Sequence, residues 1–189
     1  MTAETGGRPT VPAPEPPDAA GAWYAPDVRA QYEPYPGVVA TVRERRGVAG
    51  SEFRYETREP SLGAAGEHAV DAVAAHFDAG QHRRPLTRAG AVERADDGFE
   101  PKYERAIDRL VDATPALRRR VDYHTLREFR LLGRVTPLAL DDRVEVADVS
   151  GEDGCVVVHT SDFAPAVTRV PVDAPCVGRV ASERARAYE

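Results

Sequence analysis

The pattern of apolar and polar residues predicts two strands at the start of the folded part of the chain. Residues 38–42 form a run of small and β-branched apolar side chains, and residues 53–57 alternate between apolar and polar side chains. A period of two residues is typical of a half-buried strand. The glycine-containing residues 47–51 predict a turn between the two runs, and Pro60 ends the second one. We therefore expect a β-hairpin, with residues 32–36 leading into it.

Helical spacing governs the segment after the hairpin. Ser61 is the expected N-cap of a first helix. Its apolar residues recur at helical spacing as far as Phe77, and Gly80 is placed to close it. A weaker helix is expected over residues 86–99.

Two further helices begin at proline signals. Pro101 at the first helical position predicts a helix that ends near residue 111. Thr114 followed by Pro115 predicts a longer one, which runs to about residue 132 with its apolar residues facing inward. Gly133 is expected to end it.

The pattern returns to strands in the last third of the chain. Thr136-Pro137 repeats the start signal for a single helical turn. Three apolar runs with short turns between them then predict an antiparallel meander over residues 144–149, 155–159 and 167–172. A last helix is expected over residues 177–187. The predicted fold class is α+β: an N-terminal β-hairpin, several helices, a three-strand antiparallel meander and a C-terminal helix.

Length and composition place these elements in one domain. The chain has 189 residues, of which 42% are hydrophobic, and this is enough for one core. Residues 1–21 contain five prolines among small and polar residues, a composition that predicts a disordered Pro-rich tail. Residues 22–189 are then expected to form a single α+β domain.

The charge of the chain disfavours a general nucleic-acid role, because the formal net charge is -6. The basic run at residues 118–120 is either a solvated helix face or a phosphate-binding patch, and we favour the first interpretation.

The cysteines and the hydropathy point to a protein of the cytoplasm. Cys155 and Cys176 are too few for a disulfide framework. Cys155 opens an apolar run, so we interpret it as a small buried residue rather than a nucleophile. No stretch approaches the ~20 apolar residues of a membrane helix, and the amino terminus lacks the apolar region of a signal peptide. Direct membrane insertion is therefore not expected.

The motifs of several enzyme classes are missing from the sequence. Lys102 is the only lysine and stands between Pro101 and Tyr103, so the chain contains no G-x-x-x-x-G-K-[S/T] phosphate-binding loop. It also contains no G-x-S-x-G, H-E-x-x-H or G-x-G-x-x-G. We expect no catalytic residues, no cofactor and no enzymatic activity.

Three groups of side chains offer chemistry that has to be weighed against a plain structural role. His124 and Glu128 have the spacing of an acid/base pair, but residues one turn apart are common on any helix. The histidines His68 and His76 share a helix face without a third ligand nearby. Four acidic residues follow the predicted single turn: Asp141, Asp142, Glu145 and Asp148. They lack the glycine-centred spacing of calcium loops, so we interpret them as a capped, solvated turn and expect no metal site.

Residues 121–158 resemble a segment of a known family. In archaeal secretion ATPases of the type II/type IV family, the domain before the catalytic core contains Y-x-x-x-R-D-F-x-G-x-G-x-I-D-P-L-x-x-D-x-x-I-E-D-I, then a glycine turn and a strand ending in His. The matching residues here, in the same order, are Tyr123, Arg127, Glu128, Phe129, Gly133, Val135, Pro137, Leu138, Asp141, Val144, Glu145, Asp148, Val149 and His159.

A second block resembles the start of the same domain. The family has a P-x-x-x-V-x-I strand, a turn, and then Y-x-V-x-E-P-x-L before a helix. The matching residues here are Tyr35, Val38, Ala40, Tyr55, Thr57, Glu59, Pro60 and Leu62. The two blocks are ~65 residues apart and keep their order, which makes a chance match of both harder than of either.

The resemblance covers roughly residues 32–172 and implies the amino-terminal domain of such an ATPase, without the P-loop catalytic core. It implies a non-catalytic adaptor or regulatory subunit of a type II/type IV secretion or pilus/archaellum assembly motor. The implied partner is a P-loop secretion ATPase subunit and, through it, a membrane platform protein. The implied location is the cytoplasm, including a peripheral position at the inner face of the membrane.

The resemblance also singles out residues with interface or structural roles: Tyr123, Arg127, Phe129, Gly133, Pro137, Asp141, Asp148 and His159. Two other hypotheses stay open. One is a diverged soluble protein-binding module with no secretion role. The other is an enzyme that uses His124 or His159, for which the sequence suggests no substrate class.

Overall fold

The fold is known from a computed structural model, which describes residues 22–47, 50–77, 87–148 and 154–171. Three predictions lie outside these residues: the Pro-rich tail, Gly80 as the end of the first helix, and the helix over residues 177–187. The described residues combine one mixed six-stranded sheet with five α-helices, so the predicted α+β class is confirmed.

The sheet has the strand order β1-β2-β3-β6-β5-β4. Its strands are β1 (Val28–Tyr35), β2 (Val38–Gly47), β3 (Gly50–Arg58), β4 (Val144–Asp148), β5 (Cys155–Thr160) and β6 (Ala166–Pro171). All neighbours pair antiparallel except β3 and β6, which are parallel. The sheet therefore consists of two antiparallel meanders, one from each end of the described chain, that meet at β3 and β6.

The predicted hairpin is confirmed as β2 and β3, with Val42 opposite Tyr55. The prediction that the sheet begins with this hairpin is wrong, because β1 precedes it and pairs with β2. Polar residues and Pro34 interrupt the alternation of β1, and only Tyr35 in this strand is buried. An edge strand tolerates proline and needs little burial, which is why the pattern did not predict it.

The predicted C-terminal meander is confirmed as β4, β5 and β6. It does not stand apart from the hairpin as a second sheet. Phe53 of β3 pairs with Ala166 of β6, and the rings of Phe53 and Phe163 lie 5.3 Å apart across the same seam.

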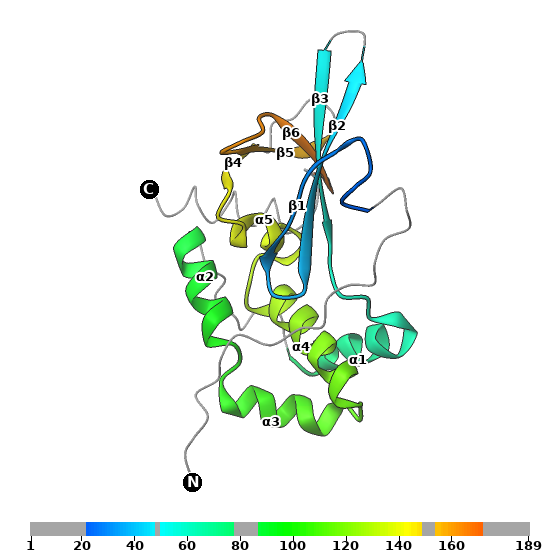
Figure 1. Cartoon of the computed structure of the whole chain (residues 1–189). Helices are drawn as coiled ribbons and strands as arrows, with labels where there is room; N and C mark the ends of the chain where they lie inside the picture. Colours follow the sequence, from blue (N-terminus) through cyan, green and yellow to red (C-terminus); the bar gives the residue numbers. More distant parts are fainter. Residues whose placement is uncertain (1–21, 48–49, 78–86, 149–153, 172–189) are drawn as a thin grey trace.

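The helices gather at the end of the sheet opposite the tip of the β2–β3 hairpin (Figure 1). They are α1 (Gly63–His76), α2 (Arg88–Asp97), α3 (Pro101–Leu110), α4 (Pro115–Phe129) and α5 (Thr136–Leu140), with a 3-10 turn, η2 (Gly133–Val135), before α5. None of the described helices is both long and apolar enough to cross a membrane.

The proline signals for the starts of α3 and α4 are confirmed. Pro101 occupies the first turn of α3, and the hydroxyl of Thr114 accepts a hydrogen bond from the backbone of Leu117. The prediction that Ser61 caps α1 is wrong, because Leu62 is the N-cap and makes no side-chain bond there. Thr136 lies inside α5 rather than at its cap, and its hydroxyl accepts from the backbone of Leu132 instead.

The end of α4 differs from the prediction. The helix stops at Phe129, three residues early, because the backbone N–H groups of Arg130 and Leu131 both bond to the carbonyl of Leu126. Leu131 is 2% exposed and packs with the buried residues of α2 and β1. The chain then turns at Gly133, whose φ of 59° is a left-handed conformation that favours glycine.

Three apolar clusters form the core. The first joins both meanders to α5 through residues such as Tyr55, Leu138 and Val158. The second joins the start of the sheet to α2 and α4 around Tyr35 and Tyr123. The third lies among α1, α3 and α4. Helix α4 contributes to two of the three, so its polar residues lie at the junction of the helices and the sheet.

Candidate functional site

Glu59 is the centre of a polar cluster between the end of β3 and helix α4. Tyr123 and Arg127 are four residues apart on α4, so they project from the same helix face. The Tyr123 hydroxyl and the Arg127 Nη1 both donate to the Oε2 of Glu59, each over 2.6 Å. Two of the predicted site residues therefore meet at one carboxylate, which comes from the other block of the family resemblance.

Arg127 lies between two acids. Its Nε and Nη2 donate to the Oε1 of Glu128, at 3.1 and 2.7 Å, while Nη1 is held by Glu59. Burial alone would lower the pKa of Arg127, but the charges of Glu59 and Glu128 outweigh it and raise that pKa. The guanidinium is therefore a fixed charge that ties α4 to the end of β3.

Burial also sets the protonation of the neighbouring groups. Burial, and then the charge of Glu59, raises the pKa of Tyr123 well above its ordinary value, so its hydroxyl stays a donor. Burial lowers the pKa of His124, so the ring is neutral at pH 7. Its Nε2 lies 2.7 Å from the carbonyl oxygen of Pro60. A neutral ring donates to a carbonyl only from the protonated nitrogen, so Nε2 carries the proton.

His124 and Glu128 do not form the acid/base pair that their spacing allowed. The imidazole faces Pro60, and the carboxylate of Glu128 faces Arg127. Both groups hold backbone and side chains in place, and this is the structural role that the sequence favoured.

Asp141 is a second polar centre and is fully buried, with 0% exposure. Its Oδ2 accepts from the hydroxyls of Tyr55 at 2.5 Å and Tyr32 at 2.7 Å, and its Oδ1 accepts from the backbone N–H of Arg143 at 2.9 Å. Arg88 donates to the backbone carbonyl of Asp141. Burial, and then Asp141, raises the pKa of both tyrosines, so both keep the protons that they donate.

The interpretation of Asp141 as part of a solvated turn is therefore wrong. The neighbouring Asp142 is exposed as expected, but Asp141 points inward and joins α5 to β1 and β3. Burying a carboxylate is costly unless its oxygens are satisfied, and three hydrogen bonds do this here. Within the described residues, no group of three or more His, Cys, Asp or Glu side chains is arranged to hold a metal ion.

The other predicted site residues lie in three different places. Phe129 packs in the core among α1, α3 and α4. Gly133 is buried in η2, and Pro137 is buried in the first turn of α5. Asp148 and His159 lie on the β4–β5 hairpin, in half-buried positions.

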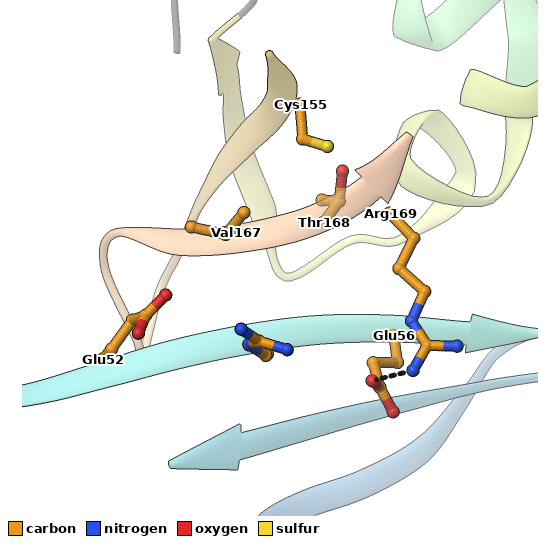
Figure 2. A pocket seen from close by; sticks show the side chains of 7 residues that line it. Glu52, Glu56, Cys155, Val167, Thr168 and Arg169 are labelled. Atoms are coloured by element: carbon orange, nitrogen blue, oxygen red, sulfur yellow. Dashed lines mark hydrogen bonds and ion pairs between the residues drawn. The ribbon is translucent and has the colours of Figure 1, made fainter. Parts of the chain in front are cut away.

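Two smaller predictions also have outcomes. In the basic run, Arg119 is exposed, but Arg118 binds Asp122 at 2.7 Å and Arg120 donates to the carbonyl of Ser61. The run is thus only partly a solvated face. Cys155 is half-buried rather than buried and lines an open pocket beside Val167 and Thr168 (Figure 2).

Sequence reasoning missed the partners of the predicted residues. Tyr32 was placed in a connecting segment, and Arg88 carried no signal at all. Glu59 was visible only as part of the family resemblance, because nothing in the local pattern indicates that α4 packs against the end of β3.

No protein-family model matches the chain, and no curated protein matches it either.

Proposed function

We propose that the chain is a non-catalytic protein-binding domain of the kind that precedes the catalytic core in archaeal-type secretion ATPases. In this role it is an adaptor or regulatory part of a type II/type IV secretion or pilus/archaellum assembly motor. Its partner is a P-loop secretion ATPase and, through it, a membrane platform protein at the cytoplasmic face of the membrane.

The observation that carries the proposal is the contact between the two resembling blocks. Glu59 belongs to the first block, and its partners Tyr123 and Arg127, 64 and 68 residues away, belong to the second. Tyr55 of the first block likewise binds Asp141 of the second. Residues that match the family in separate segments are thus hydrogen-bonded partners. This is expected when a family pattern encodes one tertiary arrangement rather than two chance matches.

The surface supports a binding role. Trp23 and Tyr24 are 71% and 64% exposed, and their rings are 5.8 Å apart in an edge-to-face arrangement. Backbone bonds hold the turn that presents them, from Ala25 to Ala22 and from Val28 to Ala25. Aromatic side chains are among the residues that most often anchor a protein interface.

A diverged binding module with no secretion role is the second candidate. The burial of Tyr123 and Asp141 favours this candidate, because both side chains form hydrogen bonds inside the domain. Such residues serve the fold whether or not a secretion partner exists, so the outer surface is free to serve another partner.

A binding experiment with purified proteins separates the two candidates. The chain is mixed with the catalytic core of a P-loop secretion ATPase from the same organism, and the complex is measured by analytical ultracentrifugation. We expect a complex that is weakened at least about tenfold when Trp23→Ala and Tyr24→Ala are combined, as for aromatic interface anchors. Arg119→Ala, an exposed change on α4, is the matched control. The absence of any complex with the unmodified chain would exclude the adaptor and leave the second candidate.

A further inference from the structure

Strands β3 and β6, which join the two halves of the sheet, are paired over a short stretch and then diverge. Phe53 pairs with Ala166 and Arg54 pairs with Val167, and the parallel pairing of β3 and β6 stops there. A pocket of ≈ 280 Å³ opens where the strands diverge. Its walls are the carboxyl-terminal halves of β3 and β6, together with side chains from α4, η2 and α5. Diverging parallel strands leave backbone polar groups outside the ladder, which is why ligands often bind at such strand ends.

Three arginine residues line this pocket. Among the described residues that line it, Arg127, Arg134 and Arg169 are basic and only Glu59 is acidic. Glu59 already accepts from Tyr123 and Arg127 through its Oε2. Glu128 also binds Arg127, and Glu56 binds Arg169, so Arg134 is the one arginine of this lining without an acidic partner among the described residues.

Arg134 and Arg169 are the groups that remain available to a ligand. Arg134 is exposed on η2, and within the described part of the chain its side chain has no hydrogen-bond or ion-pair partner. Arg169 is 83% exposed, and its Nη2 lies 2.8 Å from the Oε1 of Glu56 (Figure 2). An ion pair with such an exposed arginine contributes little free energy, so a competing anion can displace Glu56 from Arg169.

Arg169 also lines a second, wider pocket, which differs in its side chains. It has a volume of ≈ 510 Å³ and is lined by Cys155 and by two acid and two arginine side chains, Glu52, Glu56, Arg54 and Arg169 (Figure 2). Acid and arginine side chains are equal in number in this lining, and Arg134 is not part of it.

We infer that the pocket between the diverging ends of β3 and β6 binds an oxyanion, a carboxylate or a phosphate group, through Arg134 and Arg169. Both guanidiniums carry N–H groups in a planar fork that suits two oxygens of one anion. Arg127 also lines the pocket, but Glu59 and Glu128 hold its guanidinium, so it adds no net positive charge. The volume lies at or just below the small end for ligand pockets, which fits one anionic group and not a nucleotide. This inference does not depend on the proposed adaptor role.

The test is a titration with inorganic phosphate, observed through the arginine Nε–Hε signals in two-dimensional NMR spectra. Ionic strength and pH are held constant with KCl and buffer, because long-range attraction is screened by salt. We expect saturable shifts of the Arg134 and Arg169 signals. Arg134→Ala weakens the apparent affinity at least about tenfold, as the loss of a charged hydrogen-bond pair does. Arg134→Lys keeps the charge but loses the planar fork of N–H groups, so its apparent affinity should lie between those of the unmodified chain and Arg134→Ala.

The matched control is Arg119→Ala, which removes an exposed arginine from α4 and leaves the pocket intact. Shifts that do not saturate, or that are equal in Arg134→Ala and Arg119→Ala, overturn the inference. A blocked di-aspartate peptide, titrated in the same way, identifies the source of the anion. Tighter binding of phosphate points to a free or lipid-borne phosphate, and tighter binding of the peptide points to acidic side chains of a protein.

Discussion

Replacing Asp141 by Asn tests the buried carboxylate most sharply. The carboxylate accepts three hydrogen bonds, two at Oδ2 and one at Oδ1. An amide has one oxygen, so it either serves the two tyrosines or the backbone N–H of Arg143, and never all three donors. At least one donor is left without an acceptor at a residue that is 0% exposed.

The expected cost follows from these contacts. A buried donor without an acceptor costs about 1–3 kcal/mol, and each of the two remaining bonds loses the charge assistance worth about 1 kcal/mol. We therefore expect Asp141→Asn to lower the free energy of unfolding by about 3–5 kcal/mol. Asp142→Asn makes the same change of charge and shape at the exposed neighbour and should stay within about 0.5 kcal/mol of the unmodified chain.

Urea unfolding followed by circular dichroism at 222 nm measures both variants. The intrinsic fluorescence is a poor reporter, because Trp23 is the only tryptophan and is largely exposed. Combining Asp141→Asn with Tyr55→Phe adds a check, since residues in direct contact give less than additive losses. If Asp141→Asn and Asp142→Asn are equally stable, the account of the buried carboxylate is refuted.

Three further changes probe the remaining contacts. Arg127→Ala removes the cation between Glu59 and Glu128. It should lower the free energy of unfolding in urea by about 1–2 kcal/mol, a value discounted for partial exposure. Arg119→Ala should cost almost nothing, and equal losses in the two variants would contradict the role of Arg127. Because burial lowers the pKa of His124 below 6.5, the unfolded chain takes up a proton that the folded chain does not as the pH falls through and below about 6.5. Stability should therefore decline over that window, and in His124→Gln this part of the decline should vanish; an unchanged pH profile would show that His124 does not titrate in this way. Gly63 has a φ of 62° and open space around it. Gly63→Ala should therefore cost about 1 kcal/mol of stability through backbone strain alone, and Gly63→Asn should cost less. Thermal unfolding measures both variants, and equal stability of the two variants and the unmodified chain would contradict the strain argument.

Local patterns in the sequence were enough for the elements whose signals are local. Prolines at helix starts predicted α3 and α4, and strict alternation predicted β3. Edge strand β1 was missed because its exposed face tolerates Pro34 and polar residues, which weaken the alternation. The end of α4 was placed three residues late, since Leu131 and Leu132 continue an apolar pattern but serve the turn instead.

The tertiary partners had no local signal. Whether Asp141 or Asp142 points inward depends on where Tyr32 and Tyr55 lie, and these belong to strands more than 80 residues earlier. The same holds for Glu59, whose partners are supplied by α4. The parallel join of β3 and β6, which creates the arginine-lined pocket, likewise follows from long-range packing and not from the composition of either strand.

The most direct test of the proposed function is an affinity purification of the tagged chain from its native cells at native salt, with co-purified proteins identified by mass spectrometry. The account predicts recovery of a P-loop secretion ATPase or of its membrane platform protein. It also predicts that this recovery falls when Trp23→Ala and Tyr24→Ala are combined and is retained in Arg119→Ala. Recovery of unrelated soluble proteins, with neither of the predicted partners, would contradict the account.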